Sequence, residues 1–93
     1  MSARKAMEEC WICGSSAETT ELDHANRKFY QCTGEECGDY DISWRAAEIK
    51  EGDEQYKAHL QSLAKKHKGS DLIPKVVLEN GSVETKIIHR NNA

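Results

Sequence analysis

The chain has 93 residues, a formal net charge of −3 and a hydrophobic fraction of 38%. Leu, Ile, Val and Phe together number only 15, so we expect a thin core, and small domains of that kind usually rely on a metal, disulfides or a partner subunit. The length predicts one domain, no apolar run reaches the ~20 residues of a membrane span, and most enzyme folds with a deep pocket need a longer chain.

The N-terminal end indicates where the protein resides. Residues 1–9 are expected to form a flexible tail, and the stretch contains Arg4 and Lys5 but no apolar segment of a signal peptide. We therefore expect a cytoplasmic protein, and in that reducing compartment paired cysteines are more often metal ligands than disulfides. Residues 10–93 are expected to form a single small domain, with a ribbon over 10–42, a helical segment over 43–69 and a β-hairpin over 74–90.

Short strands are predicted first, over residues 19–23, 27–31 and 39–42. The first two are rich in Thr and aromatic residues, and the third alternates polar and apolar side chains. His24, Ala25 and Asn26 are read as the turn between the first two strands.

Two helices are predicted next. Ser43 is the N-cap candidate of a short helix over 44–50, and Asp53 is the N-cap candidate of a second helix. The apolar positions of the second helix follow one helical face; they are Tyr56, Leu60, Leu63, Ala64 and His67. Gly69 stands where a C′ glycine ends a helix.

A β-hairpin is predicted near the C-terminus, because two β-rich runs, 75–79 and 82–88, flank Asn80-Gly81. Asn-Gly at that position indicates a type I′ turn. Pro74 stands just before the first strand, where its missing N–H costs least. The hairpin can complete a sheet or pack on the helix, or it can offer an edge strand to a partner. The thin core also leaves a homodimer through this hairpin open.

The four cysteines carry the strongest chemical signal. They form Cys10-x2-Cys13 and Cys32-x4-Cys37, separated by 18 residues, and two tight turns that each present two thiolates are typical of a tetrahedral zinc site. Each second cysteine precedes a glycine, Gly14 or Gly38, which allows a positive φ in the turn and lets backbone N–H groups approach sulfur. We predict one structural Zn²⁺ held by all four thiolates.

Three alternatives to zinc stay open, namely a two-disulfide framework, an iron–sulfur cluster and unbound buried cysteines. His24 is a fallback fourth ligand if Cys32 or Cys37 does not reach the metal. Four thiolates close the coordination shell, whereas catalytic zinc keeps one position open for water. No Ser/His/Asp order, phosphate loop or paired-carboxylate motif stands out either, so we do not expect an enzyme.

Segments 10–15, 29–32 and 37–43 (CWICGS, FYQC and CGDYDIS) resemble a known module. It is the C-x-x-C-G-S…Y-x-C-x-x-C-G-x-Y-x-I-S zinc ribbon at the N-terminus of many small uncharacterised bacterial and phage proteins. Trp11 stands where that module often has proline, and the second turn has four residues instead of the usual two. The resemblance covers roughly residues 10–48 and implies a ribbon of short antiparallel strands, zinc and a following helix, but no activity.

The expected fold is α+β, with an N-terminal zinc ribbon, one or two helices and a C-terminal β-hairpin. Residues 1–42 carry 9 acidic and 4 basic side chains, and this acidic ribbon favours a basic protein partner. We therefore interpret the chain as a non-enzymatic interaction module that binds another protein, and by resemblance as a small bacterial or phage regulator. Trp11 is either an anchor for that partner or a residue that packs over the zinc knuckle. The core is expected to include Trp44, Phe29, Tyr30 and Tyr40, because the aliphatic residues are too few to fill it alone.

Nucleic-acid binding through the basic helix 57–68 is the alternative function. Its contacts would be Lys57, Lys65, Lys66 and Lys68, with aromatic side chains stacking on bases. The sequence pI of about 5.8 counts against a nucleic-acid partner. The lysines near the helix end also have a simpler interpretation, as solvated groups that complement the helix dipole.

Overall fold

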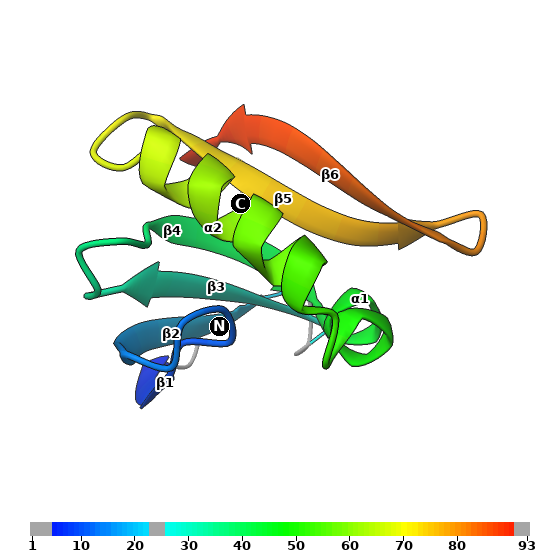
Figure 1. Ribbon diagram of the computed structural model, residues 1–93, viewed down its shortest axis with the longest axis horizontal. Coiled ribbons are helices and arrows are strands. Elements are labelled where there is room, and N and C mark those ends of the chain that lie inside the picture. Colours follow the sequence, from blue (N-terminus) through cyan, green and yellow to red (C-terminus); the bar gives the residue numbers. More distant parts are fainter. Residues whose placement is uncertain (1–4, 23–25, 91–93) are drawn as a thin grey trace.

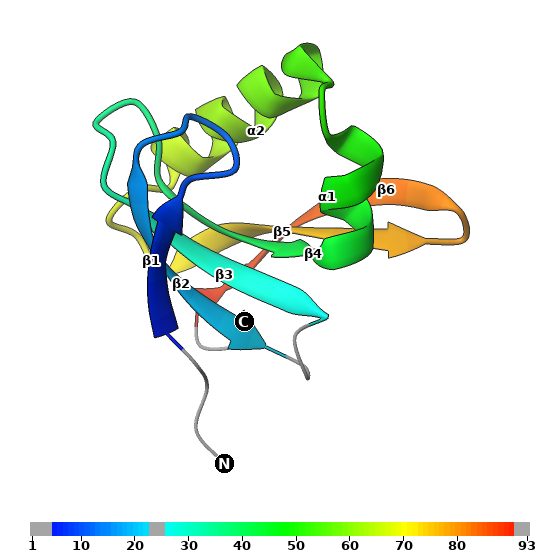
Figure 2. The ribbon, with the colours of Figure 1, turned by 90° about the horizontal axis from the view of Figure 1, so that it is seen from below.

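The computed structural model describes residues 5–22 and 26–90, which form one mixed β-sheet with two helices on one face (Figure 1, Figure 2). The elements are β1 (Lys5–Glu9), β2 (Ser16–Leu22), β3 (Arg27–Cys32), β4 (Asp39–Ser43), α1 (Trp44–Lys50), α2 (Glu54–Lys66), β5 (Leu72–Glu79) and β6 (Ser82–His89). Sheet order follows chain order from β1 to β6, and the α+β prediction is confirmed at this level.

The strands expected in the ribbon are part of this larger sheet and not a separate module. Neighbouring strands pair antiparallel from β1 to β4 and again between β5 and β6. Only β4 and β5 pair parallel, through Asp41↔Lys75 and Ile42↔Val76, and the two helices form the crossover between them. Asp23, His24 and Ala25 of the expected strand and turn lie outside the described residues.

The largest difference from the sequence prediction is β1. Residues 1–9 were expected to form a tail, but Lys5–Glu9 pairs with Ser16–Thr20 of β2. The physical reason lies in the next residues, because Cys10 donates its backbone N–H to the Ser15 carbonyl at 2.6 Å. The first cysteine turn is thus the loop of a β-hairpin, and the residues that lead into it must pair with those that leave it.

Both helices begin at the predicted caps. Ser43 Oγ accepts from the Ala46 N–H at 3.1 Å, and Asp53 Oδ1 accepts from the Tyr56 N–H at 3.0 Å. α2 ends at His67 as its C-cap, so Gly69, with φ +81°, follows one position later than predicted. Within the described residues, no helix is both long and apolar enough to cross a bilayer.

The predicted C-terminal hairpin is present and completes the sheet. Its register joins Glu79 to Ser82, and Asn80 and Gly81 have φ of 52° and 80°, as a type I′ turn requires. β5 begins at Leu72, so Pro74 lies inside the strand and not before it. Pro74 directly precedes the two residues that pair with β4, at the end of that short ladder, where a missing N–H is tolerated.

The core lies between the sheet and the helices. Its largest members there are Tyr40, Ile42, Leu60 and Val76, all at most 2% exposed. Trp44 was expected to join them, but its side chain is 61% exposed. The small neighbour Ala46 occupies the buried position in the first turn of α1 instead.

Candidate metal centre

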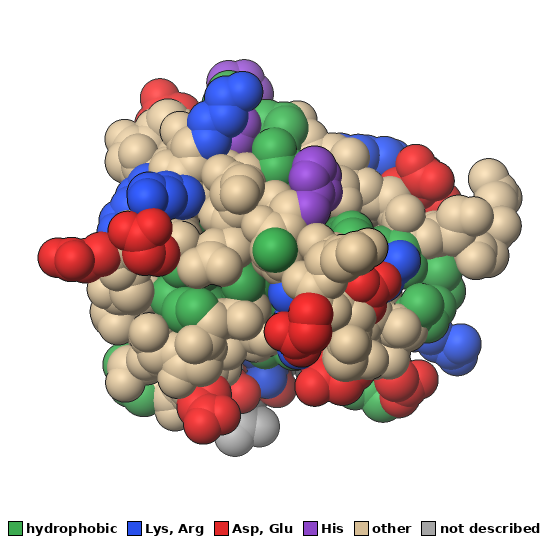
Figure 3. All heavy atoms as spheres, viewed as in Figure 1, with side chains coloured by type: hydrophobic (Ala, Val, Ile, Leu, Met, Phe, Trp, Pro, Cys, Tyr) green, Lys and Arg blue, Asp and Glu red, His purple; other side chains and the backbone are tan. Residues whose placement is uncertain are grey.

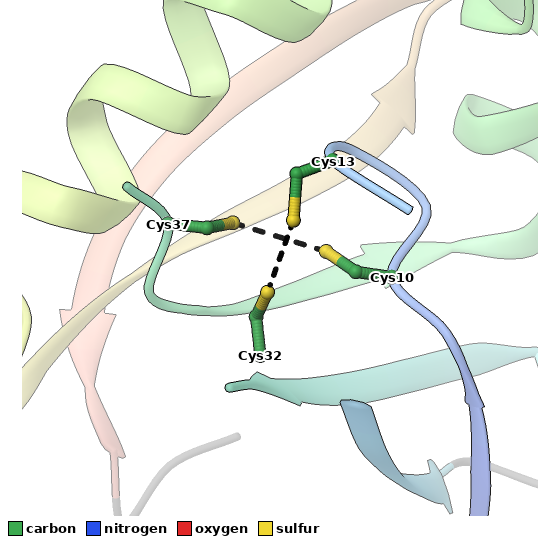
Figure 4. A group of neighbouring side chains, drawn as sticks. All are labelled: Cys10, Cys13, Cys32 and Cys37. Carbon is green, nitrogen blue, oxygen red and sulfur yellow. Dashed lines mark hydrogen bonds between the residues drawn. The ribbon is translucent and has the colours of Figure 1, made fainter. Parts of the chain in front are cut away.

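The four cysteine sulfurs converge on one point. Their Sγ atoms all lie within 4.8 Å of one another, and Figure 4 shows the four side chains directed at a common centre. Two Sγ–Sγ distances are 3.8 Å for Cys10–Cys37 and 3.3 Å for Cys13–Cys32, far beyond the ~2 Å of a disulfide bond. A tetrahedral ion with metal–sulfur bonds of ~2.3 Å separates its ligands by about 3.8 Å. The cluster can therefore hold a metal ion.

The first cysteine pair lies on the loop between β1 and β2. The Gly14 N–H donates to the Cys10 carbonyl at 2.9 Å, which closes the turn around the two thiols. Gly14 has φ +79°, and this confirms the prediction that glycine supplies a left-handed position after Cys13.

The second pair joins the end of β3 to the start of β4. The Cys37 N–H donates to the Gly34 carbonyl at 3.3 Å. Gly38 does not have a positive φ, so that prediction is wrong at this position. The reason for glycine is space, because a Cβ at Gly38 would lie 2.2 Å from the Ala64 carbonyl oxygen of α2. The loop and the helix backbone can approach this closely only without a side chain.

Three of the four cysteines are buried, namely Cys10, Cys32 and Cys37, and Cys13 is exposed. Burial raises the pKa of the Cys32 thiol to about 12. The Cys37 pKa is also raised, first by its contact with Cys10 and then by burial. Four thiolates cannot accumulate here without a compensating charge, which a divalent cation held by the four sulfurs would supply.

Cys10 ionises more readily than the other two buried thiols. Its pKa is lowered to about 4, first by the Cys37 thiol and further by the Tyr40 hydroxyl, which is 3.2 Å from Cys10 Sγ. Burial raises the pKa of Tyr40, and the charge on Cys10 raises it further. Tyr40 therefore remains protonated and donates a hydrogen bond to the Cys10 thiolate. Tyr40 was expected in the core, and its place in the Y-x-I-S segment is the only sequence signal for this contact with Cys10.

Trp11, a predicted partner contact, packs within the molecule and is only partly buried. Its Nε1–H donates to Glu51 Oε2 at 2.7 Å. Lys57 Nζ lies 4.6 Å from the centre of the Trp11 ring and 3.7 Å from Glu51 Oε1. The predicted contact residues Trp11 and Lys57 thus form one cluster with Glu51, an acidic residue that no sequence motif indicated.

The other three predicted contacts lie near the end of α2. Lys65 Nζ pairs with Glu36 Oε1 at 2.7 Å, and Lys68 Nζ donates to the Gly34 carbonyl at 3.2 Å. Both lysines thereby tie α2 to the loop between Cys32 and Cys37, whereas Lys66 is exposed to solvent. Figure 3 shows acidic and basic groups interspersed on this face of the molecule. The fallback ligand His24 lies outside the described residues.

Comparison of the chain with protein-family models, with curated proteins and with solved structures finds no match.

Proposed function

We propose that the protein is a non-enzymatic interaction module whose binding surface is held in place by one structural Zn²⁺. The observation that supports this most directly is the convergence of Cys10, Cys13, Cys32 and Cys37, whose sulfurs lie within 4.8 Å of one another. Zinc adopts this four-thiolate, tetrahedral arrangement in structural sites. A closed shell offers no position for a substrate or an activated water, which argues against catalysis at the metal.

The ligand chemistry and the motif favour zinc over the alternatives. The Cys-x2-Cys turn and the glycine after each second cysteine match the zinc-ribbon module that segments 10–15 and 37–43 resemble. The sulfur separations argue against a disulfide framework. We place the protein in a reducing cytoplasm, where four such thiols persist.

The proposed protein-binding surface includes α1. Trp44 and Ile49 on this short helix are 61% and 54% exposed, and large apolar side chains of this kind often anchor protein interfaces. Arg45 and Glu48 are both exposed on the same helix, so the charges of α1 favour neither sign in a partner. We expect a partner with an apolar pocket, and the acidic first part of the chain favours basic residues beside that pocket.

Two experiments test this proposal. Metal analysis of protein purified without added metal should find one zinc per chain, and Cys37→Ser should lose it. Selection from a random displayed peptide library should enrich sequences with apolar and basic residues that bind wild type but not Trp44→Ala. Met7→Ala, which truncates a similarly exposed apolar side chain on β1, is the matched control. Iron in place of zinc would contradict the proposed metal. Enrichment that Trp44→Ala leaves unchanged would contradict the proposed binding surface.

The alternative of nucleic-acid binding through helix 57–68 has less support. Lys57, Lys65 and Lys68 are engaged by Glu51, Glu36 and the Gly34 carbonyl within the chain. A mobility-shift assay with generic DNA and RNA at low salt is expected to show no retention.

A further inference from the structure

The strand β6 forms one edge of the sheet, and in the part of the chain that the structure describes no strand pairs with its outer side. The strand is eight residues long, and the hairpin that it forms with β5 projects past the ends of the neighbouring strands in Figure 1. Ile87 is 43% exposed on this strand. Natural proteins usually protect or use an edge of this kind, because its free N–H and C=O groups invite pairing.

The turn determines which residues of β6 offer those groups. A two-residue type I′ turn makes Glu79 and Ser82 the closing hydrogen-bonded pair. Alternate residues from Ser82 onward therefore bond to β5, and the intervening ones, Val83, Thr85 and Ile87, carry their N–H and C=O groups on the outer side. An antiparallel partner strand must place its own outward-bonding residues opposite these three.

A second copy of β6 satisfies this requirement, and its side chains complement those of the first copy in charge and in apolar character. In the antiparallel register centred on Thr85, each Glu84 lies opposite the second copy's Lys86, and each Val83 lies opposite the second copy's Ile87. Opposite charges and apolar pairs directly across two strands are stabilising. The two neighbouring allowed registers, centred on Glu84 and on Lys86, place two like charges opposite each other. The charge pattern therefore selects one register.

We infer that the protein forms a homodimer in which β6 pairs antiparallel with β6 of a second copy, about a two-fold axis at Thr85. The two sheets then form one continuous sheet, a mode of association known as β-augmentation. Lys86 also pairs with Glu79 of its own chain at 2.6 Å, but both side chains are about half exposed, so this ion pair contributes little and permits a second partner. The inference does not rest on the metal site.

Charge reversal tests the register directly. Glu84→Lys and Lys86→Glu each convert both opposite-charge pairs into like-charge pairs in a homodimer, whereas a mixture of the two variants restores both pairs. Glu18→Lys on β2, an exposed strand residue away from β6, is a matched control for the change in charge. Sedimentation velocity of the metal-loaded proteins over a range of concentrations measures the dimer Kd, and native mass spectrometry with one variant isotopically labelled identifies the heterodimer. Circular dichroism verifies that every variant is folded.

The inference predicts that wild type and Glu18→Lys are dimers and that each reversed variant alone has a Kd raised by about tenfold or more. It also predicts that the mixture of the two reversed variants forms a 1:1 heterodimer. A monomeric wild type would overturn the inference. So would reversed variants that dimerise as tightly as wild type, or folded variants whose mixture forms no heterodimer. None of these results would affect the proposed zinc site.

Discussion

Tyr40 connects the core of the sheet to the cysteine cluster. Its ring stacks on Tyr30 with a centroid distance of 4.8 Å, and its hydroxyl lies 3.2 Å from Cys10 Sγ. A protonated phenol in this position stabilises the negative charge of a thiolate. Groups that hydrogen-bond to metal ligands tune the affinity of the metal, as well as the orientation of the ligand.

Tyr40→Phe is therefore expected to weaken zinc binding by about tenfold, because it removes the hydrogen bond and keeps the ring stack. Competition with a chromophoric chelator measures the affinity. Tyr56→Phe is the matched control, since its hydroxyl bonds to Thr85 and not to a cysteine. If both variants bind zinc with the affinity of wild type, the Tyr40 hydroxyl does not contribute to metal binding.

Gly38→Ala is expected to lower the free energy of unfolding by about 3 kcal/mol, because the new Cβ meets the backbone of α2 at Ala64. Gly52→Ala is the control. Gly52 has φ +87° with open space around it, so alanine there costs only the strain of the left-handed conformation, about 1 kcal/mol. Urea unfolding of both variants and of wild type measures the two losses in the free energy of unfolding. A smaller loss at Gly38 than at Gly52 would show that the loop can move away from the helix.

The helices and the C-terminal hairpin can be predicted because short sequence motifs specify them, whereas other elements depend on contacts between distant residues. Ser43 and Asp53 cap the helices, and Asn80-Gly81 closes the hairpin, so each is recognisable from a few adjacent residues. β1 has no such signal, because Lys5–Glu9 becomes a strand only when the first cysteine turn folds back onto β2. The parallel pairing of β4 with β5 joins residues more than thirty positions apart, and no local pattern encodes it.

The contacts of the candidate site likewise differ in whether the local sequence predicts them. The cysteine spacing predicts all four members of the cluster that the structure brings together. The contact of Gly38 with α2 and the ion pair of Lys65 with Glu36 depend on how the helix packs against the second cysteine loop. Trp44 was misplaced for a related reason, since a cap specifies where a helix begins but not which of its faces is buried.

The attachment of β1 is expected to depend on pH through Glu8. Its carboxylate accepts from Thr19 Oγ1 at 2.6 Å and from Lys28 Nζ at 3.0 Å, and these contacts lower the pKa of Glu8 below its ordinary value of 4.5. A carboxyl group with a lowered pKa contributes stability above its unfolded-state pKa and loses it as the pH falls through the folded-state value. Hydrogen exchange of the β1 amides should therefore be slow near neutral pH and become faster, relative to the amides of β3, as the pH falls below about 4.5.

Glu8→Gln is the control for this prediction, because glutamine does not titrate. Its β1 amides should be less protected than those of wild type near neutral pH, and this difference should shrink in acid. Equal protection of β1 in the two proteins at every pH would show that Glu8 does not hold the strand.

At the scale of the whole molecule, the cysteine cluster joins two loops at the same end of the sheet. It ties the β1–β2 loop to the β3–β4 loop, and the second of these packs on α2 through Gly38. The apolar core is small for a chain of 93 residues. A metal bound only by the folded state adds its binding free energy to the stability of the fold.

Removing zinc with a chelator is therefore expected to unfold most of the protein, with the loss of the cooperative thermal transition. Near-ultraviolet circular dichroism should report the loss of the packing around Tyr30 and Tyr40, and added zinc should restore it. A transition temperature that is unchanged by chelation would show that the core suffices without metal.

Native mass spectrometry of the protein purified under reducing conditions without added metal tests the central claim most directly. The account predicts one zinc ion per chain, with four protons displaced from Cys10, Cys13, Cys32 and Cys37. A metal-free chain that has lost four hydrogens to form two disulfides, or a folded chain with four protonated thiols and no metal, would contradict it.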